Sequence, residues 1–353
     1  MTPRPLLSIV VPTYQRAAML RVMLQALLPQ AAELRDRVEV CIGDNASTDS
    51  TADVVHEAMR LNSGAVVRLV RRERNLGAIR NLVHGATEDA CGDFVWAIGD
   101  DDLVTPGTVR RLCDALRAHA EVDYFYVNFA MASFPLHWPS AAHGGYVGPV
   151  CDVAHDYAGD RHVRHWQELI DHTSSMGTQV YAHIVRRTVW TRYWDGRSIP
   201  PDYHAVESTY PHTAMLIDEA WDQPAIFLGG VHLVLFNDRP GWGEGQAARI
   251  VLVAFPLLLA RLDDRGIGIH TLMRARKYLE ESHVGAYRAL LTGEGGHDAV
   301  QVLHASLALG GRYPELVSAV VTAIQSPHAP LVPALVEAVR DALLALQPQR
   351  TAA

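Results

Sequence analysis

The chain has 353 residues, of which 49% are hydrophobic and 20% charged, a composition typical of a folded globular protein. Its formal net charge is -8, which argues against nucleic acid as a partner. The longest apolar run, residues 250–260, is too short to cross a bilayer and contains a proline. The four cysteines have no metal-site spacing and the N-terminus has no signal-peptide pattern, so we expect a cytoplasmic location.

Strand and helix signals alternate regularly over residues 1–130. Apolar, β-branched runs, about thirty residues apart as in strand–helix units, predict strands at 7–11, 38–42, 66–70, 94–98 and 124–129. Amphipathic stretches predict helices over 17–28 and after Ser50, Gly77 and Thr105. Thr105 is the expected N-cap of the last helix, with Pro106 in its first position. The alternation indicates an α/β fold with a mostly parallel, doubly wound sheet.

The remainder of the chain divides into two further regions. Residues 131–245 mix polar loops with weaker helix and strand signals. Residues 246–353 are rich in leucine and alanine at helical spacing, which predicts a C-terminal helical appendage.

Polar segments follow each of the first four predicted strands. They read PTYQR (12–16), GDNASTDST (43–51), RNLGAIRN (74–81) and GDDD (99–102). Ligands of such sheets bind at the carboxyl ends of the strands, so we predict a ligand site where these segments meet. The sequence has neither the GxGxxG turn of dinucleotide-binding folds nor a phosphate-binding P-loop.

Three consecutive carboxylates, Asp100, Asp101 and Asp102, come directly after the fourth predicted strand. Like charges this close repel one another, so the loop is either fully solvated or the site of a bound cation. Its position at the predicted ligand-binding edge favours the cation. Carboxylate oxygens suit Mg²⁺ or Mn²⁺.

Four motifs, in this order and spacing, resemble the inverting family-two glycosyltransferases with the GT-A fold. They are SIVVPTYQRAAML, CIGDNASTDST, RNLGAIRN and DFVWAIGDDDLVTPG. The match is most similar to the abequosyltransferase-like branch, which adds deoxysugars to bacterial polysaccharide precursors. It covers residues 6–130 well and 165–240 loosely, and it does not reach the C-terminal helices.

The resemblance implies transfer of a sugar, with inversion, from a nucleotide diphosphate donor to an acceptor hydroxyl. The acceptor would be a saccharide, a lipid-linked molecule or a small molecule, in bacterial polysaccharide, glycoconjugate or natural-product biosynthesis. Residues 1–130 would form the nucleotide-sugar-binding half of the GT-A domain. Residues 131–245 would form the acceptor half with the catalytic base and a lid loop.

The resemblance also assigns donor-binding roles to single positions. The nucleotide-sugar-binding set is Pro12, Thr13, Tyr14, Arg16, Asp44, Asn45, Asn75, Gly77, Arg80 and Asp100. Tyr14 offers a stacking face, and Asp44 would accept a hydrogen bond from the base. Arg80 suits phosphate oxygens, which a guanidinium binds in a bidentate way. Its alternative role is an ion pair with Glu73 or Asp89.

Aligning Pro106 with the proline that commonly follows the acidic motif makes Asp101 the direct metal ligand. Asp100 then faces the ribose, and Asp102 supports the metal shell. The family often has aspartate at the position of Gly99, which leaves open whether one or two side chains of this chain touch the ion.

The catalytic base of the family is an Asp or Glu some hundred residues beyond the metal motif. Glu207 has the best spacing, followed by Asp202, with Asp195 as a third candidate. Further residues are expected near the acceptor, the donor sugar or the lid. They are Gly177, Thr178, Gln179, His212 and Trp242, the last in a glycine-rich loop over 237–245.

Two other functions stay open. The first is a sugar-phosphate nucleotidyltransferase, which is disfavoured because the glycine-rich first loop of such enzymes is missing from this sequence. The second is a catalytically silent scaffold subunit that binds a sugar nucleotide. The C-terminal helices could form a homodimer interface, shield the acceptor site or rest on a membrane surface.

Overall fold

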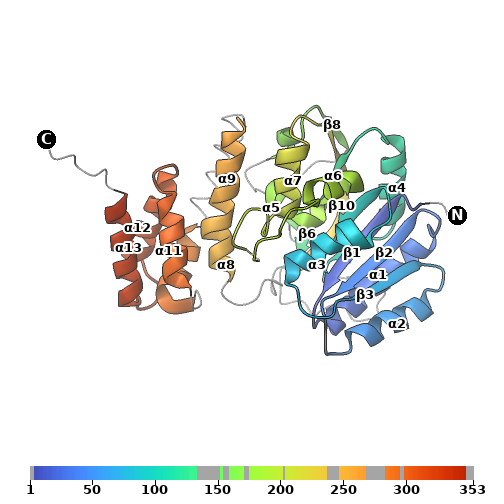
Figure 1. Ribbon diagram of the computed structural model, residues 1–353, viewed down its shortest axis with the longest axis horizontal. Coiled ribbons are helices and arrows are strands. Elements are labelled where there is room, and N and C mark those ends of the chain that lie inside the picture. The colour runs from blue at the N-terminus through green and yellow to red at the C-terminus, as the bar shows by residue number, and fades with distance from the viewer. Residues whose placement is uncertain are drawn as a thin grey trace. The chain divides into compact units, whose positions relative to one another are not determined.

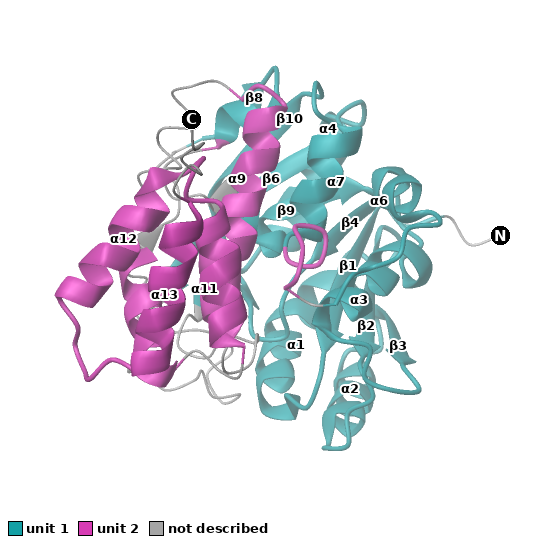
Figure 2. Cartoon of the chain, turned by 60° about the vertical axis from the view of Figure 1, so that its left-hand side comes forward, with its two compact units in different colours: residues 1–169, 175–202, 210–240 teal, residues 170–174, 203–209, 241–353 magenta. Residues whose placement is uncertain are grey.

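The structure, a computed structural model, divides into two compact units (Figure 2). Unit 1 comprises Met1–Leu169, Ser175–Asp202 and Tyr210–Pro240, and unit 2 comprises Ile170–Ser174, Tyr203–Thr209 and Gly241–Ala353. The residues that the structure describes are 4–132, 152–153, 159–170, 175–201, 203–236, 246–267, 283–294 and 298–346.

Unit 1 is built on a mixed sheet, which has ten strands in the described part of the chain (Figure 1). The strands are β1 (Leu7–Thr13), β2 (Val38–Asp44), β3 (Val66–Arg71), β4 (Phe94–Ala97), β5 (Leu103–Val104), β6 (Tyr124–Ala132), β7 (Asp152–Val153), β8 (Arg161–Val163), β9 (His183–Arg186) and β10 (Ala225–Phe236). Their order is β3-β2-β1-β4-β9-β6-β10-β5, with β7 beside β6 and β8 beside β10. All five predicted strands are confirmed.

The sheet is mixed: within the described residues its four parallel strand pairs are longer than its five antiparallel ones. Strands β3, β2, β1 and β4 pair in parallel, and so do β6 and β10. Strand β9 lies between β4 and β6 and is antiparallel to both, so these two blocks run in the same direction. The strands β5, β7 and β8 are also antiparallel to their neighbours.

Helices connect and cover the strands of unit 1. They are α1 (Ala17–Ala32), α2 (Thr51–Leu61), α3 (Ala78–His84), α4 (Thr108–Ala118), α5 (Ser175–Thr178), α6 (Arg187–Trp194) and α7 (Pro211–Glu219). The strand order reverses after β3, so right-handed crossovers place α1 and α2 on one face and α3 on the other. The reversal falls between β1 and β4, whose carboxyl ends are the usual ligand position in such sheets.

Helix α4 begins at Thr108, so the prediction of a helix start at Pro106 with Thr105 as its N-cap was wrong. Thr105 is tied to β10 instead. Its N–H donates to the carbonyl of His232 at 3.0 Å and its hydroxyl to the carbonyl of Val231 at 2.7 Å. The N-cap position belongs to Gly107, whose φ of 80° is a left-handed conformation that glycine adopts without strain.

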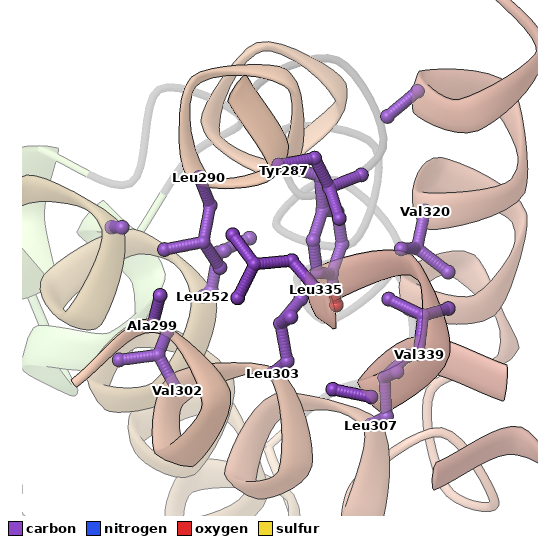
Figure 3. Close-up of a cluster of buried hydrophobic side chains, with 14 of the residues drawn as sticks. Leu252, Tyr287, Leu290, Ala299, Val302, Leu303, Leu307, Val320, Leu335 and Val339 are labelled. Atoms are coloured by element: carbon purple, nitrogen blue, oxygen red, sulfur yellow. The ribbon is translucent and has the colours of Figure 1, made fainter. Parts of the chain in front are cut away.

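The described part of unit 2 is mostly helical, and its segment Tyr203–Thr209 forms turns and bends. Its helices are α8 (Gln246–Arg249), α9 (Phe255–Asp264), α11 (Ala299–Ala308), α12 (Pro314–Gln325) and α13 (Pro333–Ala345). Figure 3 shows the apolar side chains that they share, including Leu252, Leu303 and Val339, all buried. Within this core the hydroxyl of Tyr287 has a hydrogen-bond partner in Ser306 at 2.7 Å. None of the helices in the described ranges has the length and hydropathy needed to cross a bilayer.

Candidate active site

The loop after β1 carries the first group of predicted site residues. Thr13 is buried and its hydroxyl donates to Oδ2 of Asp100 at 2.7 Å, whereas the Tyr14 ring is 41% exposed. Gln15 has a φ of 55°, a conformation that costs a non-glycine residue about 1–2 kcal/mol. Its N–H donates to the hydroxyl of Ser47 at 2.9 Å, which fixes this loop to the loop after β2.

The acidic triplet after β4 faces the same loop. Asp100 lies 3.1 Å from one terminal nitrogen of Arg16, and Asp101 pairs with the other terminal nitrogen. Asp102 turns back, so that one of its carboxylate oxygens accepts a hydrogen bond from the N–H of Gly99 at 2.6 Å. The Asp101 side chain is 19% exposed and that of Asp100 only 4%, which leaves Asp101 the more accessible of this pair.

Burial makes the triplet reluctant to carry three negative charges. It raises the pKa of Asp100 to about 6, with the charge of Asp101 adding to the effect and Arg16 opposing it. Burial also raises the pKa of Asp102 well above the ordinary value, and the charge of Asp101 again adds to it. Positive charge placed at this loop is therefore favourable.

The carboxylates of Asp101 and Asp102 fold back close to the Cα of Gly99. A Cβ at this position would lie 2.9 Å from Oδ1 of Asp101 and 3.0 Å from Oδ2 of Asp102. Both contacts are closer than ordinary packing allows. The glycine in place of the family's frequent aspartate thus has a steric reason in this chain.

The loop after β2 presents Asp44, which is fully buried. Its carboxylate accepts a hydrogen bond from the N–H of Ser47 and one from Nε of Arg71, each at 2.9 Å. Arg71 also donates to the carbonyl of Ser47 at 3.0 Å, and its side chain reaches the surface. Sequence reasoning missed Arg71, although its place at the end of β3, beside the end of β2, could have indicated it.

Asn45 links the loops after β2 and β3. Its amide nitrogen donates to Oδ1 of Asn75 at 2.8 Å and to the carbonyl of Gly77 at 3.1 Å, and its oxygen accepts from the N–H of Leu76 at 2.8 Å. Gly77 has a φ of 93°, which suits glycine. The side chain of Asn45 therefore positions the predicted donor-binding segment over 75–77.

Arg80 donates to the carbonyl of Ile199 at 2.8 Å. The ion pair with Asp89 that the sequence left open for Arg80 is formed by Arg72. Arg72 also donates through Nε to Oδ1 of Asn81 at 3.0 Å.

Tyr181 is a second residue that sequence reasoning missed, because no motif surrounds it. Its backbone carbonyl accepts a hydrogen bond of 2.7 Å from the indole of Trp96, and its ring lies edge-on to Phe129 with centroids 5.1 Å apart. Burial raises its pKa well above the ordinary value, and the nearby charges of Asp102 and Asp101 add to this. Tyr181 therefore lies close to the acidic triplet.

The predicted acceptor residues lie partly in the described chain. The hydroxyl of Thr213 donates to the carbonyl of Gly177 at 2.7 Å, which joins the segment of Gly177, Thr178 and Gln179 to the start of α7. His212 is buried with its ring centroid 4.4 Å from that of His183, and burial lowers its pKa to about 3. Contact of His212 with an acceptor would need its surroundings to move. Trp242 lies outside the described residues.

The candidate bases lie in different parts of the chain. Glu207 belongs to unit 2, where Oε1 of its carboxylate lies 2.6 Å from a terminal nitrogen of Arg261 on α9. Asp195 directly follows α6 in unit 1. Asp202 lies outside the described residues.

Sequence comparison matches the chain to one family model and to two individual proteins. The sequence model described as glycosyl transferase family 2 matches residues 8–184, half of the chain. Abequosyltransferase RfbV of Salmonella typhimurium is 32% identical over 117 residues, which are 33% of this chain and 34% of that protein. Validoxylamine A glucosyltransferase of Streptomyces hygroscopicus subsp. jinggangensis is 53% identical over 51 residues, 14% of this chain and 12% of that protein. The chain thus matches about a third or less of the length of these relatives.

Solved structures resemble the chain over most of its length. Residues 1–349 of TarS from S. aureus align with a TM-score of 0.56 at 15% identity, covering 90% of this chain and 88% of that one. Mannosyltransferase PcManGT from Pyrobaculum calidifontis, solved with GDP-Man and Mn²⁺, aligns with a TM-score of 0.52 at 18% identity, covering 98% and 89%. The fold is that of GT-A glycosyltransferases. With the match over residues 8–184, the chain belongs to glycosyl transferase family 2.

Proposed function

We propose that this chain is a metal-dependent, inverting glycosyltransferase that moves a sugar from a nucleotide diphosphate donor to an acceptor hydroxyl. The observation that carries the proposal is the hydrogen-bonded contact between Thr13 at the end of β1 and Asp100 after β4. It joins the acidic triplet to the end of β1, where the strand order reverses and where such sheets bind nucleotides. Membership of glycosyl transferase family 2 supports the reaction class.

We propose that the residues after β4 hold a divalent cation. Asp101 offers hard carboxylate oxygens, and Mg²⁺ or Mn²⁺ is usually held by one or two carboxylates together with substrate phosphates. Arg16 already pairs with Asp100 and Asp101, which supports the affinity of this site for positive charge. We assign Asp101 as the ligand and Asp102 as its support. A divalent ion there would offset the charge of the departing diphosphate as a Lewis acid.

The remaining roles follow the predicted set. Tyr14 would stack on the base, Asp44 would accept a hydrogen bond from it, and Asp100 would face the ribose. Asp44 already accepts from Ser47 and Arg71, and a carboxylate has lone pairs for a further donor. Arg80 would bind the diphosphate.

Inversion requires an acceptor hydroxyl that attacks in line and a base that takes its proton. We propose Glu207 for this base, with Asp202 as the second candidate. Arg261 holds the Glu207 carboxylate at 2.6 Å within unit 2, which limits the side chain to few orientations. In the reaction, this carboxylate would accept the hydroxyl proton while the sugar's bond to the diphosphate breaks.

We also propose a saccharide, lipid-linked or small-molecule acceptor, in bacterial polysaccharide, glycoconjugate or natural-product biosynthesis. The names of the relatives support this, because one is an abequosyltransferase and the other glucosylates validoxylamine A. A homodimer through the C-terminal helices, contact with a membrane surface and the three-region division at 130 and 245 stay predictions.

Turnover of a panel of labelled nucleotide sugars with Mn²⁺ tests the proposal. We expect transfer with release of nucleoside diphosphate, and a loss of about a hundredfold or more in kcat for Asp101→Ala and for Glu207→Gln. Glu219→Gln is the matched control, because Glu219 forms a comparable ion pair with Arg192. Release of pyrophosphate would support a nucleotidyltransferase, and donor binding without turnover a silent scaffold. Full activity of both site variants in the presence of a chelator would contradict the proposal.

A further inference from the structure

Arg16 pairs with two carboxylates of the acidic triplet. Its two terminal nitrogens contact different carboxylates, Asp100 at 3.1 Å and Asp101. The fork also touches the sulfur of Met19, at 3.1 Å from Nε and 2.8 Å from the terminal nitrogen that pairs with Asp101. The side chain is only 22% exposed, so the pair is shielded from bulk water and salt.

Arg16 and a metal ion at this cluster would both carry positive charge and would bind the same carboxylate. Asp101, the proposed ligand, offers its Oδ2 to the guanidinium. An ion that binds the same carboxylate must either share it with a positively charged neighbour or displace that neighbour. Sharing brings like charges together in a partly buried site, where Coulomb repulsion is stronger than in water.

Displacement of Arg16 needs no rearrangement of the helix that follows. Arg16 is the N-cap residue of α1, yet its side chain makes no capping hydrogen bond. Its backbone carbonyl accepts from the N–H of Leu20 at 3.0 Å, a bond that side-chain rotation leaves intact. Rotation of the long side chain is therefore enough to free Asp101.

A diphosphate gives the displaced guanidinium another partner. Arginine binds phosphate oxygens with the same bidentate geometry that it uses for carboxylates. When metal arrives alone, Arg16 loses an anionic partner and gains none. When it arrives with a diphosphate, Arg16 exchanges a carboxylate for a phosphate at little cost.

We propose that Arg16 competes with the divalent ion for Asp101, and that the donor diphosphate releases it. Metal and nucleotide then bind with positive cooperativity, and the metal binds weakly when nucleotide is missing. The inference rests on the proposed function, because it takes Asp101 as a metal ligand. It adds to the predicted nucleotide-sugar-binding role of Arg16 that of a counter-ion of the triplet.

Titration of the full chain with Mn²⁺, followed by the electron paramagnetic resonance signal of the free ion, tests the proposal without any turnover. Without nucleotide, we expect Arg16→Gln to bind Mn²⁺ about tenfold more tightly than the unaltered chain. Addition of UDP or GDP, each corrected for its own Mn²⁺ complex, should tighten Mn²⁺ binding more in the unaltered chain than in Arg16→Gln.

Arg21→Gln is the matched control. It removes the same charge from α1, but Arg21 pairs with Glu57 in an ion pair in which both side chains are exposed. Its Mn²⁺ affinity should equal that of the unaltered chain. Arg16→Lys serves as a second variant that keeps the charge if Arg16→Gln does not fold. A single ammonium lacks the fork that bridges both carboxylates, so Mn²⁺ should bind Arg16→Lys more tightly than the unaltered chain.

Two results would overturn the inference while leaving the proposed function intact. Equal Mn²⁺ affinity of the Arg16 variants and the unaltered chain would show no competition. Weaker Mn²⁺ binding by these variants would show that Arg16 organises the ligands. Failure of every protein to bind Mn²⁺, with UDP and with GDP, would instead remove the metal from the proposed function, and the inference with it.

Discussion

The hydroxyl of Thr13, the last residue of β1, donates a hydrogen bond of 2.7 Å to Oδ2 of Asp100, the third residue after β4. Both side chains are buried, and 87 residues separate them in the chain. The bond joins two strand ends at the point where the sheet order reverses. It holds in place the carboxylate whose neighbour, Asp101, we propose as the metal ligand.

Thr13→Val keeps the shape of this side chain and removes its donor. A hydrogen bond to a charged group contributes about 1.5–3 kcal/mol, so we expect the free energy of unfolding to fall by about that amount. Urea denaturation near neutral pH measures it. Thr13→Ser keeps the hydroxyl and should lose less stability. Equal stability of the valine variant and the unaltered chain would mean that the bond contributes nothing.

The raised pKa of Asp100 predicts a dependence of stability on pH. Because burial raises this pKa from 3.8 to about 6, the folded chain binds the proton more tightly than the unfolded chain does. The resulting stabilisation is complete below about pH 4 and is lost as the pH rises through about 6, a difference of roughly 3 kcal/mol.

Asp100→Asn removes this titrating group. In chelator-treated buffer, the free energy of unfolding of the unaltered chain should fall by about 3 kcal/mol relative to the variant between about pH 4 and pH 7. Asp102 also has a raised pKa, to which the charge of Asp100 contributes, so the difference between the two proteins includes this coupling. A constant difference between the two proteins across this range would refute the expectation.

Asn45→Ala removes three hydrogen bonds between the loops after β2 and β3. We expect a loss of about 1–3 kcal/mol in the free energy of unfolding, because partly buried polar groups lose their partners. We also expect weaker donor binding, since the segment over 75–77 is no longer held. Asn45→Asp keeps the acceptor for Leu76 but places a carboxylate oxygen against Oδ1 of Asn75 and the carbonyl of Gly77, so it should lose at least as much stability. Thermal unfolding and donor titration measure both effects.

Two glycine substitutions should separate site geometry from backbone strain. Gly99→Ala places a methyl group against Asp101 and Asp102, whose flexible ends can shift, so we expect weaker Mn²⁺ binding and little loss of stability. Gly107→Ala meets no atom within 4 Å but forces alanine into a left-handed conformation. This should cost about 1 kcal/mol of stability and leave Mn²⁺ binding unchanged. The opposite pattern would contradict the steric argument for Gly99.

The sequence alone determined most elements of the first 130 residues, and it indicated the edge of the sheet at which we propose the donor site. Strand and helix patterns, and the polar segments that follow strands, are local signals that depend on neighbours in the chain. These signals therefore predicted the strands β1 and β4 and the polar GDDD segment that follows β4. The start of α4 was misread because Thr105 bonds to β10, whose residues lie more than a hundred positions away.

Only the tertiary structure decided which side chains of the site hold one another. Arg16 pairs with Asp101, 85 positions away, and Glu207 pairs with Arg261, 54 positions away. The side chain of Asn45 donates a hydrogen bond to Asn75 in the loop after β3, and Arg71 at the end of β3 donates one to Asp44. These pairings depend on which polar groups the fold brings together away from water. A local sequence pattern carries no information about partners so far away in the chain. The sequence thus indicated that Asp100 and Asp101 lie at the end of β4, and only the fold showed that Arg16 is the cation that pairs with them.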